Sequence, residues 1–164
     1  MKLDEGIQHT VELKDDKPVA ARNYRLSPEQ SEHIEEWVKE MYAAGFIQPS
    51  TSAYSSPIIV IKKPIGWRIV HDYRAVNAQT IIPPSLIPRR EEIVDSMAGS
   101  QYFTSMDLRS GYYQIPLRES DRPITAFSTK TGHWEYTVLA QGLCGGPATF
   151  NRVMQEIFKD LQDI

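Results

Sequence analysis

A stripe of apolar side chains between Ser27 and Gly45 is the feature that most constrains how this chain can fold. Its members recur at the i, i+3, i+4 spacing that places side chains on one face of a helix. Pro28 suits the first helical position, Ser27 and Gln30 can form a capping box, and Gly45 ends the pattern. The members of the stripe are Ile34, Trp37, Val38, Met41 and Tyr42. The sequence therefore predicts a helix that must bury this face against another layer.

Two stretches rich in β-branched and aromatic residues predict β-hairpins. The first consists of residues 57–63 and 67–73, PIIVIKK and WRIVHDY, with a turn at residues 64–66. The second is ITAFSTKTGHWEYTVLA at residues 124–140, with Lys-Thr-Gly at residues 130–132 in its turn. Both hairpins would supply antiparallel strands on which a helix can pack.

The remaining elements do not alternate strictly between helix and strand. Residues 1–26 are polar and predict a short strand or an extended arm. An irregular stretch at 77–90 precedes a short helix at about 90–98, and QYFTSMDL at 101–108 predicts a buried strand. Pro147 opens a last helix, whose apolar stripe comprises Phe150, Val153, Met154, Ile157, Phe158 and Leu161. This order favours an α+β fold over a doubly wound α/β fold.

Composition excludes several classes of protein. Hydrophobic residues make up 41% and charged residues 24% of the 164 residues, which is ordinary for a globular protein. No apolar run approaches the ~20 residues that cross a membrane, and the N-terminus lacks the apolar centre of a signal peptide. The single cysteine, Cys144, excludes an internal disulfide and fits a reducing, intracellular setting, cytoplasmic or nuclear.

Charge is distributed unevenly along the chain. The net charge of −3 argues mildly against a nucleic-acid partner. Residues 1–50 carry six Lys or Arg against ten Asp or Glu, a balance of −4. Residues 58–90 carry six Lys or Arg against only Asp72, a balance of +5. The basic stretch is therefore the one place where a polyanion could dock.

Asp107 is the first candidate for chemistry, because the predicted strand at 101–108 delivers it at its end. A lone carboxylate in such a place is more often a cap or a salt-bridge partner. The functional interpretation is a ligand for Mg²⁺, which prefers oxygen ligands and in phosphoryl transfer commonly acts as two ions about 4 Å apart. One aspartate cannot hold such a pair, so further carboxylates would have to lie elsewhere.

A glycine-rich turn before the last helix is the second candidate. It contains Gly142, Gly145 and Gly146, which allow a close approach of backbone to an anion or a base pair. It is not a P-loop, because the Lys-Ser/Thr pair is missing. Turns before helices often have this composition for purely structural reasons, so the pattern by itself leaves both interpretations open.

The basic first hairpin is the third candidate. Lys62, Lys63 and Arg68 flank its turn. Exposed basic residues at a hairpin tip are mostly solubilising, but they could also clamp a triphosphate or a template backbone. Tyr73, beside Arg74, offers a ring on which a base could stack.

Five sequence blocks in a fixed order carry more information than any of these candidates alone. They are SPEQ…AGFIQPSTSAYSSPIIVIKK, GWRIVHDYRAVN, YFTSMDLRSGYYQIP, TAFSTKTGHWEYTVLAQGL and GGPATF. Together they resemble the reverse transcriptase of gypsy-type LTR retrotransposons, from about residue 6 to residue 164. The resemblance implies part of a right-hand polymerase. Its expected parts are an N-terminal arm (1–26), fingers (27–93 and 118–146) and a partial palm (94–117 and 147–164).

The resemblance also implies roles for single residues. Asp107 matches the first catalytic aspartate, a ligand of both Mg²⁺ ions, and Tyr112 matches the aromatic gate that favours deoxynucleotides. Tyr73 and Arg74 would contact the template strand. The residues implied to contact the incoming dNTP are Lys62, Lys63, Arg68, Leu108, Arg109, Tyr112, Gln141 and Gly142. The implied partners are therefore an RNA or DNA template–primer and a dNTP, with Mg²⁺ as cofactor.

The chain departs from the family pattern in three places. The fingers turn, KKPIGWR, is one residue shorter than the usual KKxDGxWR, and Ala140–Gln141 stands where many relatives have Pro-Phe. The second acidic motif, aromatic-x-Asp-Asp, is absent, since the only Asp-Asp pair is Asp15–Asp16 in the arm. This absence predicts that the chain alone does not extend a primer.

Two functions are consistent with these features. The first is a fragment of an RNA-directed DNA polymerase that carries the template- and dNTP-binding half of the site and is inactive alone. The alternative is a non-enzymatic, retroelement-derived interaction module that acts through protein partners. Without further palm strands, the last helix would present an apolar face beside an open sheet edge. This predicts self-association or a protein partner at the palm.

Overall fold

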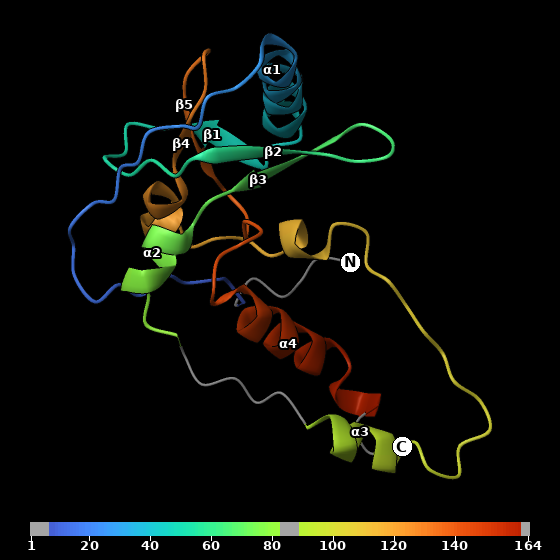
Figure 1. Cartoon of the computed structure of the whole chain (residues 1–164). Helices are drawn as coiled ribbons and strands as arrows, with labels where there is room; N and C mark the ends of the chain where they lie inside the picture. Colours follow the sequence, from blue (N-terminus) through green and yellow to red (C-terminus); the bar gives the residue numbers. More distant parts are fainter. Residues whose placement is uncertain (1–6, 83–88, 162–164) are drawn as a thin grey trace.

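The computed structural model describes residues 7–82 and 89–161, in which short helices and strands are joined by irregular stretches (Figure 1). The α-helices are α1 (Pro28–Ala43), α2 (Arg74–Gln79), α3 (Arg90–Ser96) and α4 (Gly146–Ile157). The strands are β1 (Ile47–Pro49), β2 (Ile58–Lys62), β3 (Trp67–His71), β4 (Phe127–Ser128) and β5 (His133–Tyr136). The 3₁₀ helices are η1 (Gly111–Gln114), η2 (Glu119–Thr125) and η3 (Lys159–Leu161). The predicted α+β class is confirmed.

Helix α1 begins and ends where the sequence predicts. The Ser27 hydroxyl accepts a hydrogen bond from the N–H of Gln30 (3.2 Å), and the Gln30 carboxamide oxygen accepts one from the N–H of Ser27 (2.9 Å). Gly45 follows the helix with φ +75°, which glycine adopts without strain. The stripe packs inward except at Tyr42, which is 53% exposed. The helix is therefore specified locally and held by burial of one face.

Both predicted hairpins form antiparallel sheets. Strands β2 and β3 pair with Ile58 opposite His71 and Lys62 opposite Trp67. Gly66, with φ +74°, closes their turn. In the second sheet β5 lies between β1 and β4, so the predicted hairpin β4–β5 gains a third strand from the segment after α1. The two hairpin predictions are confirmed.

An aromatic core joins the two sheets to α1. Its members are Trp37, His71, Tyr73, Phe127 and Tyr136. The ring centroids of His71 and Phe127 lie 4.4 Å apart, and His71 Nε2 and the Tyr136 hydroxyl hydrogen-bond at 3.0 Å. Burial lowers the pKa of His71 from 6.5 to about 3, because no charge compensates the desolvated imidazolium. The imidazole is thus a neutral core side chain.

The N-terminal arm is an extended strap that crosses the fold. Its backbone N–H groups donate to three separate segments: before η2, at the end of α2 and before β2. The donor–acceptor pairs are His9 with Pro116 (2.9 Å), Lys14 with Gln79 (2.8 Å) and Ala21 with Ser55 (2.9 Å). Val11, a residue of the strap, is itself buried in the hydrophobic core. The extended arm, one of the two predicted forms, is confirmed.

Helix α4 begins at a pair of glycines that the arm approaches closely. Pro147 stands in its first turn, as predicted. His9 Nδ1 and the Thr149 hydroxyl hydrogen-bond at 2.8 Å, and a Cβ on Gly145 would lie 3.1 Å from the His9 ring. Burial lowers the pKa of His9 from 6.5 to about 4. A neutral histidine from the arm therefore fixes the start of α4.

Residues 101–108, which we call the open segment, are not the buried strand that the sequence predicts. Within residues 7–82 and 89–161, no backbone group of the open segment pairs with another backbone group. A strand without a ladder partner leaves its amides to water and is unstable. Tyr102 is accordingly 92% and Met106 70% exposed. Figure 1 shows the stretch between α3 and η1 as a long loop that lies apart from the sheets before it returns to η1.

A second difference from the prediction is the short helix α2. The irregular stretch expected at 77–90 starts later, because residues 74–79 form α2; residues 83–88 lie outside the described part of the chain. The helix expected at about 90–98 is confirmed as α3. Among the residues described here, no helix is long and apolar enough to span a membrane.

Candidate functional site

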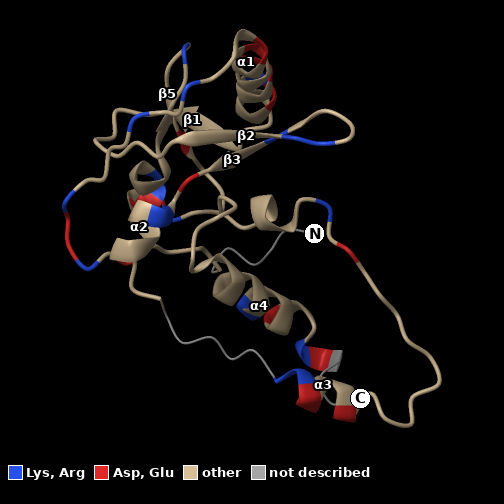
Figure 2. Ribbon diagram, in the orientation of Figure 1, with Lys and Arg blue, Asp and Glu red and all other residues tan. Residues whose placement is uncertain are grey.

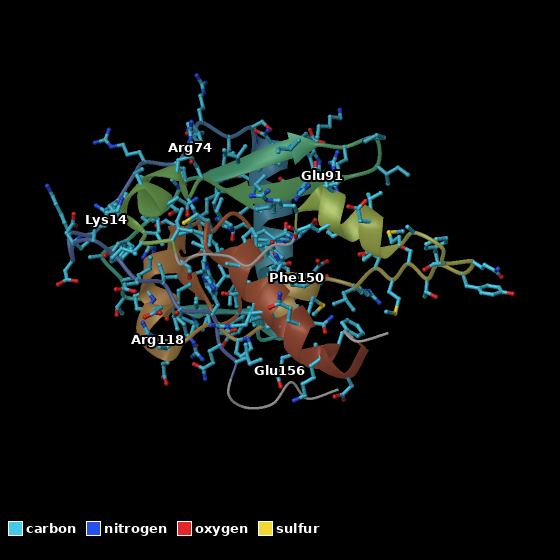
Figure 3. The ribbon with its side chains drawn as sticks, turned by 90° about the horizontal axis from the view of Figure 1, so that it is seen from below. Lys14, Arg74, Glu91, Arg118, Phe150 and Glu156 are labelled. Carbon is cyan, nitrogen blue, oxygen red and sulfur yellow. The ribbon has the colours of Figure 1, made fainter. Side chains whose placement is uncertain are left out.

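A cavity of about 570 Å³ lies between the end of the open segment, η1 and α4. Four residues that the sequence predicts to belong to one site line it: Asp107, Leu108, Tyr112 and Gln141. They come from three separate segments of the chain. Phe150 and Met154 of α4 form the apolar floor, and in Figure 3 Phe150 lies on α4 near the centre of the view. The structure therefore brings four predicted site residues to one wall.

The turn into η1 positions Tyr112 against α4. Ser110 has φ 51°, a left-handed conformation that reverses the chain after the open segment. A Cβ on Gly111 would lie 2.9 Å from the Phe150 ring, so only glycine lets η1 approach α4 this closely. The ring centroids of Tyr112 and Phe150 then lie 5.4 Å apart. Tyr112 is held by this contact at the wall of the cavity.

Arg68 connects the β2–β3 hairpin to the cavity. Its Nη2 donates to Gln141 Oε1 at 3.2 Å, across 73 residues of sequence. The hairpin lysines lie further from the cavity: Lys62 Nζ sits 5.7 Å from the centroid of the Trp67 ring, and Lys63 is exposed beside the turn. Figure 2 shows Lys and Arg in blue along this hairpin. Only Arg68 of the three predicted hairpin cations therefore touches a residue that lines the cavity.

Arg74 is exposed but ion-paired. Its Nε donates to Asp72 Oδ1 at 2.8 Å and its Nη2 to Asp72 Oδ2 at 2.7 Å, and the Tyr24 hydroxyl donates to the same Oδ2 at 2.9 Å. Hydrogen bonds from Arg74 hold the pKa of Asp72 well below its usual range. The Arg74 side chain is 83% exposed, and Figure 3 shows it at the edge of the molecule. Arg74 Nη2 also donates to the Tyr24 hydroxyl at 3.4 Å, so Asp72 and Tyr24 together hold the guanidinium.

The structure corrects the stacking role expected of Tyr73. The side chain is 2% exposed, and its hydroxyl donates to the Thr125 carbonyl at 3.0 Å inside the aromatic core. Burial raises the pKa of Tyr73 well above 10. A buried ring cannot stack on a base, so Tyr73 supports the fold and Arg74 alone remains at the surface.

The turn at 141–144 is held by a residue that the sequence does not single out for the site. Asn77 Nδ2 donates to the Gly142 carbonyl at 2.8 Å, and Asn77 Oδ1 accepts from the N–H of Cys144 at 3.0 Å. Gly142 has φ +105°, as a glycine in a tight turn can. No local sequence pattern indicates this role of Asn77, because the contact spans 65 residues of sequence.

The described residues do not by themselves fit a two-metal centre. Asp107 is exposed at the mouth of the cavity, and the neighbouring Arg109 uses its carbonyl to accept from Gln114 Nε2 at 2.9 Å. No cluster of three or more His, Cys, Asp or Glu side chains suited to a metal ion occurs within 7–82 and 89–161. Two-metal phosphoryl transfer needs more carboxylates than Asp107 supplies.

The chain is similar in sequence to polyproteins of mobile elements. It is 36% identical to the Retrovirus-related Pol polyprotein from transposon 412 of Drosophila melanogaster, over 93% of this chain and 13% of that protein. It is 38% identical to the Pol polyprotein from transposon 297 of the same organism, over 94% and 15%. The Enzymatic polyprotein of Cauliflower mosaic virus is 30% identical over 96% and 24%. The chain thus spans a quarter or less of the length of these relatives.

Solved structures and the family match agree with this similarity. The foamy viral protease-reverse transcriptase in complex with an RNA/DNA hybrid superposes with a TM-score of 0.84 at 25% identity, over 94% of this chain and 21% of that chain. The same protein in its native crystal form also gives 0.84. Residues 60–164, more than half of the chain, match the family described as reverse transcriptase (RNA-dependent DNA polymerase). The chain therefore belongs to the reverse transcriptase family.

Proposed function

We propose that this chain is the part of a gypsy-type retrotransposon reverse transcriptase that holds the template–primer and the incoming deoxynucleotide. The observation that carries the proposal is the cavity that unites Asp107, Leu108, Tyr112 and Gln141, together with the hydrogen bond from Arg68 to Gln141. These residues are the ones that the family resemblance assigns to one site. The structural relative bound to an RNA/DNA hybrid supports nucleic acid as the ligand.

In this proposal the residues bind and orient rather than react. Arg68, with Lys62 and Lys63 on the same hairpin, neutralises the triphosphate, since a charged substrate needs cationic cover. The Tyr112 ring occupies the space that a ribose 2′-hydroxyl would need, while Gln141 and Gly142 lie under the new base pair. Arg109 and the backbone at Leu108 face the phosphates. Arg74 contacts the template strand through the guanidinium donors that Asp72 and Tyr24 leave free.

The proposal assigns parts of the chain to the subdomains of a right-hand polymerase. Residues 27–93 and 118–146 are the fingers, and residues 94–117 and 147–164 contribute to the palm. The superposition on the foamy viral protease-reverse transcriptase, which covers 94% of this chain, supports this placement. An intracellular location belongs to the same proposal, because a lone cysteine fits a reducing compartment.

Magnesium enters the proposal only through Asp107. When bound in a complete enzyme, Mg²⁺ would polarise the phosphates of the nucleotide. Since the described residues do not complete a two-metal centre, we expect no primer extension by this chain on an RNA template with Mg²⁺. Extension that is lost in Asp107→Asn would contradict this expectation and show that the chain carries a complete catalytic site.

Binding to a labelled RNA/DNA hybrid tests the proposed function. We expect binding that weakens as salt is raised, because ion pairs with phosphates release counterions. Arg74→Ala, which removes the proposed contact with the template strand, should weaken binding and lower the salt slope by about one. Arg22→Ala, which removes an equal charge from the exposed arm, is the matched control and should leave binding near the unmodified value. No binding at low salt, or equal effects of the two variants, would overturn the proposal.

The open segment favours a second candidate function, a protein-interaction module. Its exposed side chains include Tyr102, Phe103, Met106 and Leu108, an apolar set that soluble monomers seldom present together. This candidate predicts association of the chain with itself. Size-exclusion chromatography with light scattering distinguishes the two: a monomer that binds the hybrid favours the polymerase part, and an oligomer without hybrid binding favours the module.

A further inference from the structure

We infer that Asn77 is a positioning residue of this site: its side-chain amide clamps the turn at 142–144 and thereby fixes the place of Gln141. The functional half of this inference rests on the proposed function, because it assigns Gln141 to the nucleotide side of the cavity. The structural half concerns only the contact between α2 and the turn. The two halves have separate tests.

The clamp is geometrically specific. The amide nitrogen of Asn77 donates to the Gly142 carbonyl (2.8 Å), while the amide oxygen accepts from the N–H of Cys144 (3.0 Å). One planar group thus joins both ends of the turn, and only one orientation of the amide satisfies both partners. A side chain with a single polar function could satisfy one of these contacts but not both. The clamp therefore requires an amide at this position.

Helix α2 gives the clamp a rigid base. Val76, next to Asn77, is buried, and the Thr80 hydroxyl donates to the Val76 carbonyl at 2.9 Å. The arm crosses the end of the helix, where the N–H of Lys14 donates to the Gln79 carbonyl at 2.8 Å. A helix of this length is not stable alone. These tertiary contacts hold α2 in place, and the hydrogen bonds from Asn77 hold the turn against α2.

The turn needs such support because little else holds its outer end. Gln141 and Gly142 are exposed, and the first buried side chain of the turn is Leu143. A Cβ on Gly142 would lie 3.3 Å from the Tyr73 ring, so the backbone passes close over the aromatic core. Gln141 projects from this backbone to the cavity and to Arg68. If the clamp is removed, Gln141 loses its fixed distance from Arg68.

The single cysteine of the chain reports on the clamp directly. Cys144 is partly buried, and its N–H is one of the two groups that Asn77 holds. Thiol reactivity depends on exposure, so a released turn reacts faster with a disulfide reagent. We expect Asn77→Ala to react about tenfold faster than the unmodified chain, the scale of one lost hydrogen bond. Asn151→Ala on α4 is the matched control and should leave the rate unchanged.

A double-mutant cycle on the binding of a dNTP to the chain–hybrid complex tests whether Asn77 acts through Gln141. We expect Asn77→Ala to weaken dNTP binding by roughly five- to tenfold in the unmodified chain but by less than about twofold in a Gln141→Ala background. A residue that only stabilises the fold would weaken both backgrounds equally. Where Asn77→Ala does not fold, Asn77→Ser replaces it, since its hydroxyl is too short to span the turn.

Each outcome decides one part of the inference. Unchanged Cys144 reactivity in the folded Asn77 variant overturns the clamp. Faster reaction with equal loss of binding in both backgrounds overturns the positioning of Gln141. If the unmodified chain does not bind the hybrid or does not bind the dNTP, the proposed function fails, the assignment of Gln141 fails with it, and Cys144 reactivity alone decides the clamp.

Discussion

The aromatic core and the open segment contain similar residues in opposite environments. Phe127 in the core is fully buried, whereas Phe103 in the open segment is 62% exposed. The core is formed by α1 and both sheets, and each strand of these sheets pairs with a neighbouring strand. The open segment has an equally strand-like sequence, yet within the described residues no strand pairs with it. A sequence of residues that favour β-structure therefore forms a strand only where a neighbouring strand is available for hydrogen bonding.

The comparison also separates two kinds of site residue. Arg68, Tyr112 and Gln141 belong to parts that the core and the strap hold in place. Asp107 belongs to the open segment, and the described residues do not fix its backbone. The positions of Arg68, Tyr112 and Gln141 are therefore fixed by contacts with the rest of the fold, whereas that of Asp107, which the resemblance assigns to catalysis, is not.

The largest expected effect distinguishes the two phenylalanines. Phe127→Ala removes a fully buried ring beside His71 and Tyr136, and we expect it to lower the free energy of unfolding by about 3–5 kcal/mol. Phe103→Ala, the matched control, should change it by less than about 0.5 kcal/mol. Urea unfolding followed by circular dichroism measures both. Similar losses from the two variants would break the comparison.

Acidification should lower the free energy of unfolding, because two histidines are buried as neutral groups. The folded-state pKa values of His9 and His71 lie near 4 and 3, below the unfolded value of 6.5. The unfolded chain therefore binds more protons between about pH 4 and 6.5, and stability falls as pH falls through this window. Between pH 7 and 5 we expect a loss of about 2 kcal/mol per histidine.

Urea unfolding at several pH values checks this expectation. His9→Gln should remove roughly half of the loss between pH 7 and 5, because one of the two depressed groups is gone. A free energy of unfolding that stays constant from pH 7 to 5 would show that the two imidazoles are not buried as neutral groups.

The smallest expected effect on stability is in the open segment. Tyr102→Ser should change the free energy of unfolding by less than about 0.5 kcal/mol, because this side chain is 92% exposed. The same variant should reduce any association of the chain, since it removes exposed apolar surface. Light scattering at high protein concentration measures this. Undiminished association would place the contact surface outside the open segment.

Local patterns explain how much of the fold the sequence could predict. The capping box of Ser27 and Gln30 and the glycine at position 66 act within a few residues, so α1 and the β2–β3 turn were predictable. The open segment was not, because a strand depends on a partner distant in sequence. The short α2 has no periodic stripe to reveal it.

The candidate site could also be predicted only in part. Resemblance assigned Asp107, Tyr112 and Gln141 to one place, and the structure brings them to one cavity. Neither resemblance nor pattern could show that Tyr73 faces inward while its neighbour Arg74 faces water. Neighbouring side chains can face opposite sides of the backbone, and which one is buried depends on the packing of the whole fold.

Hydrogen–deuterium exchange, with and without an RNA/DNA hybrid and a matching dNTP, tests whether the cavity beside η1 and α4 binds these ligands. Without the hybrid, we expect slow exchange in β2, β3, β5 and α4 and fast exchange in the open segment. With the hybrid and a matching dNTP, we expect new protection at residues 67–68, 110–113 and 141–144, and none along the arm at residues 9–21. Protection confined to α1 or the arm, or no change anywhere on saturation with hybrid and dNTP, would contradict the account.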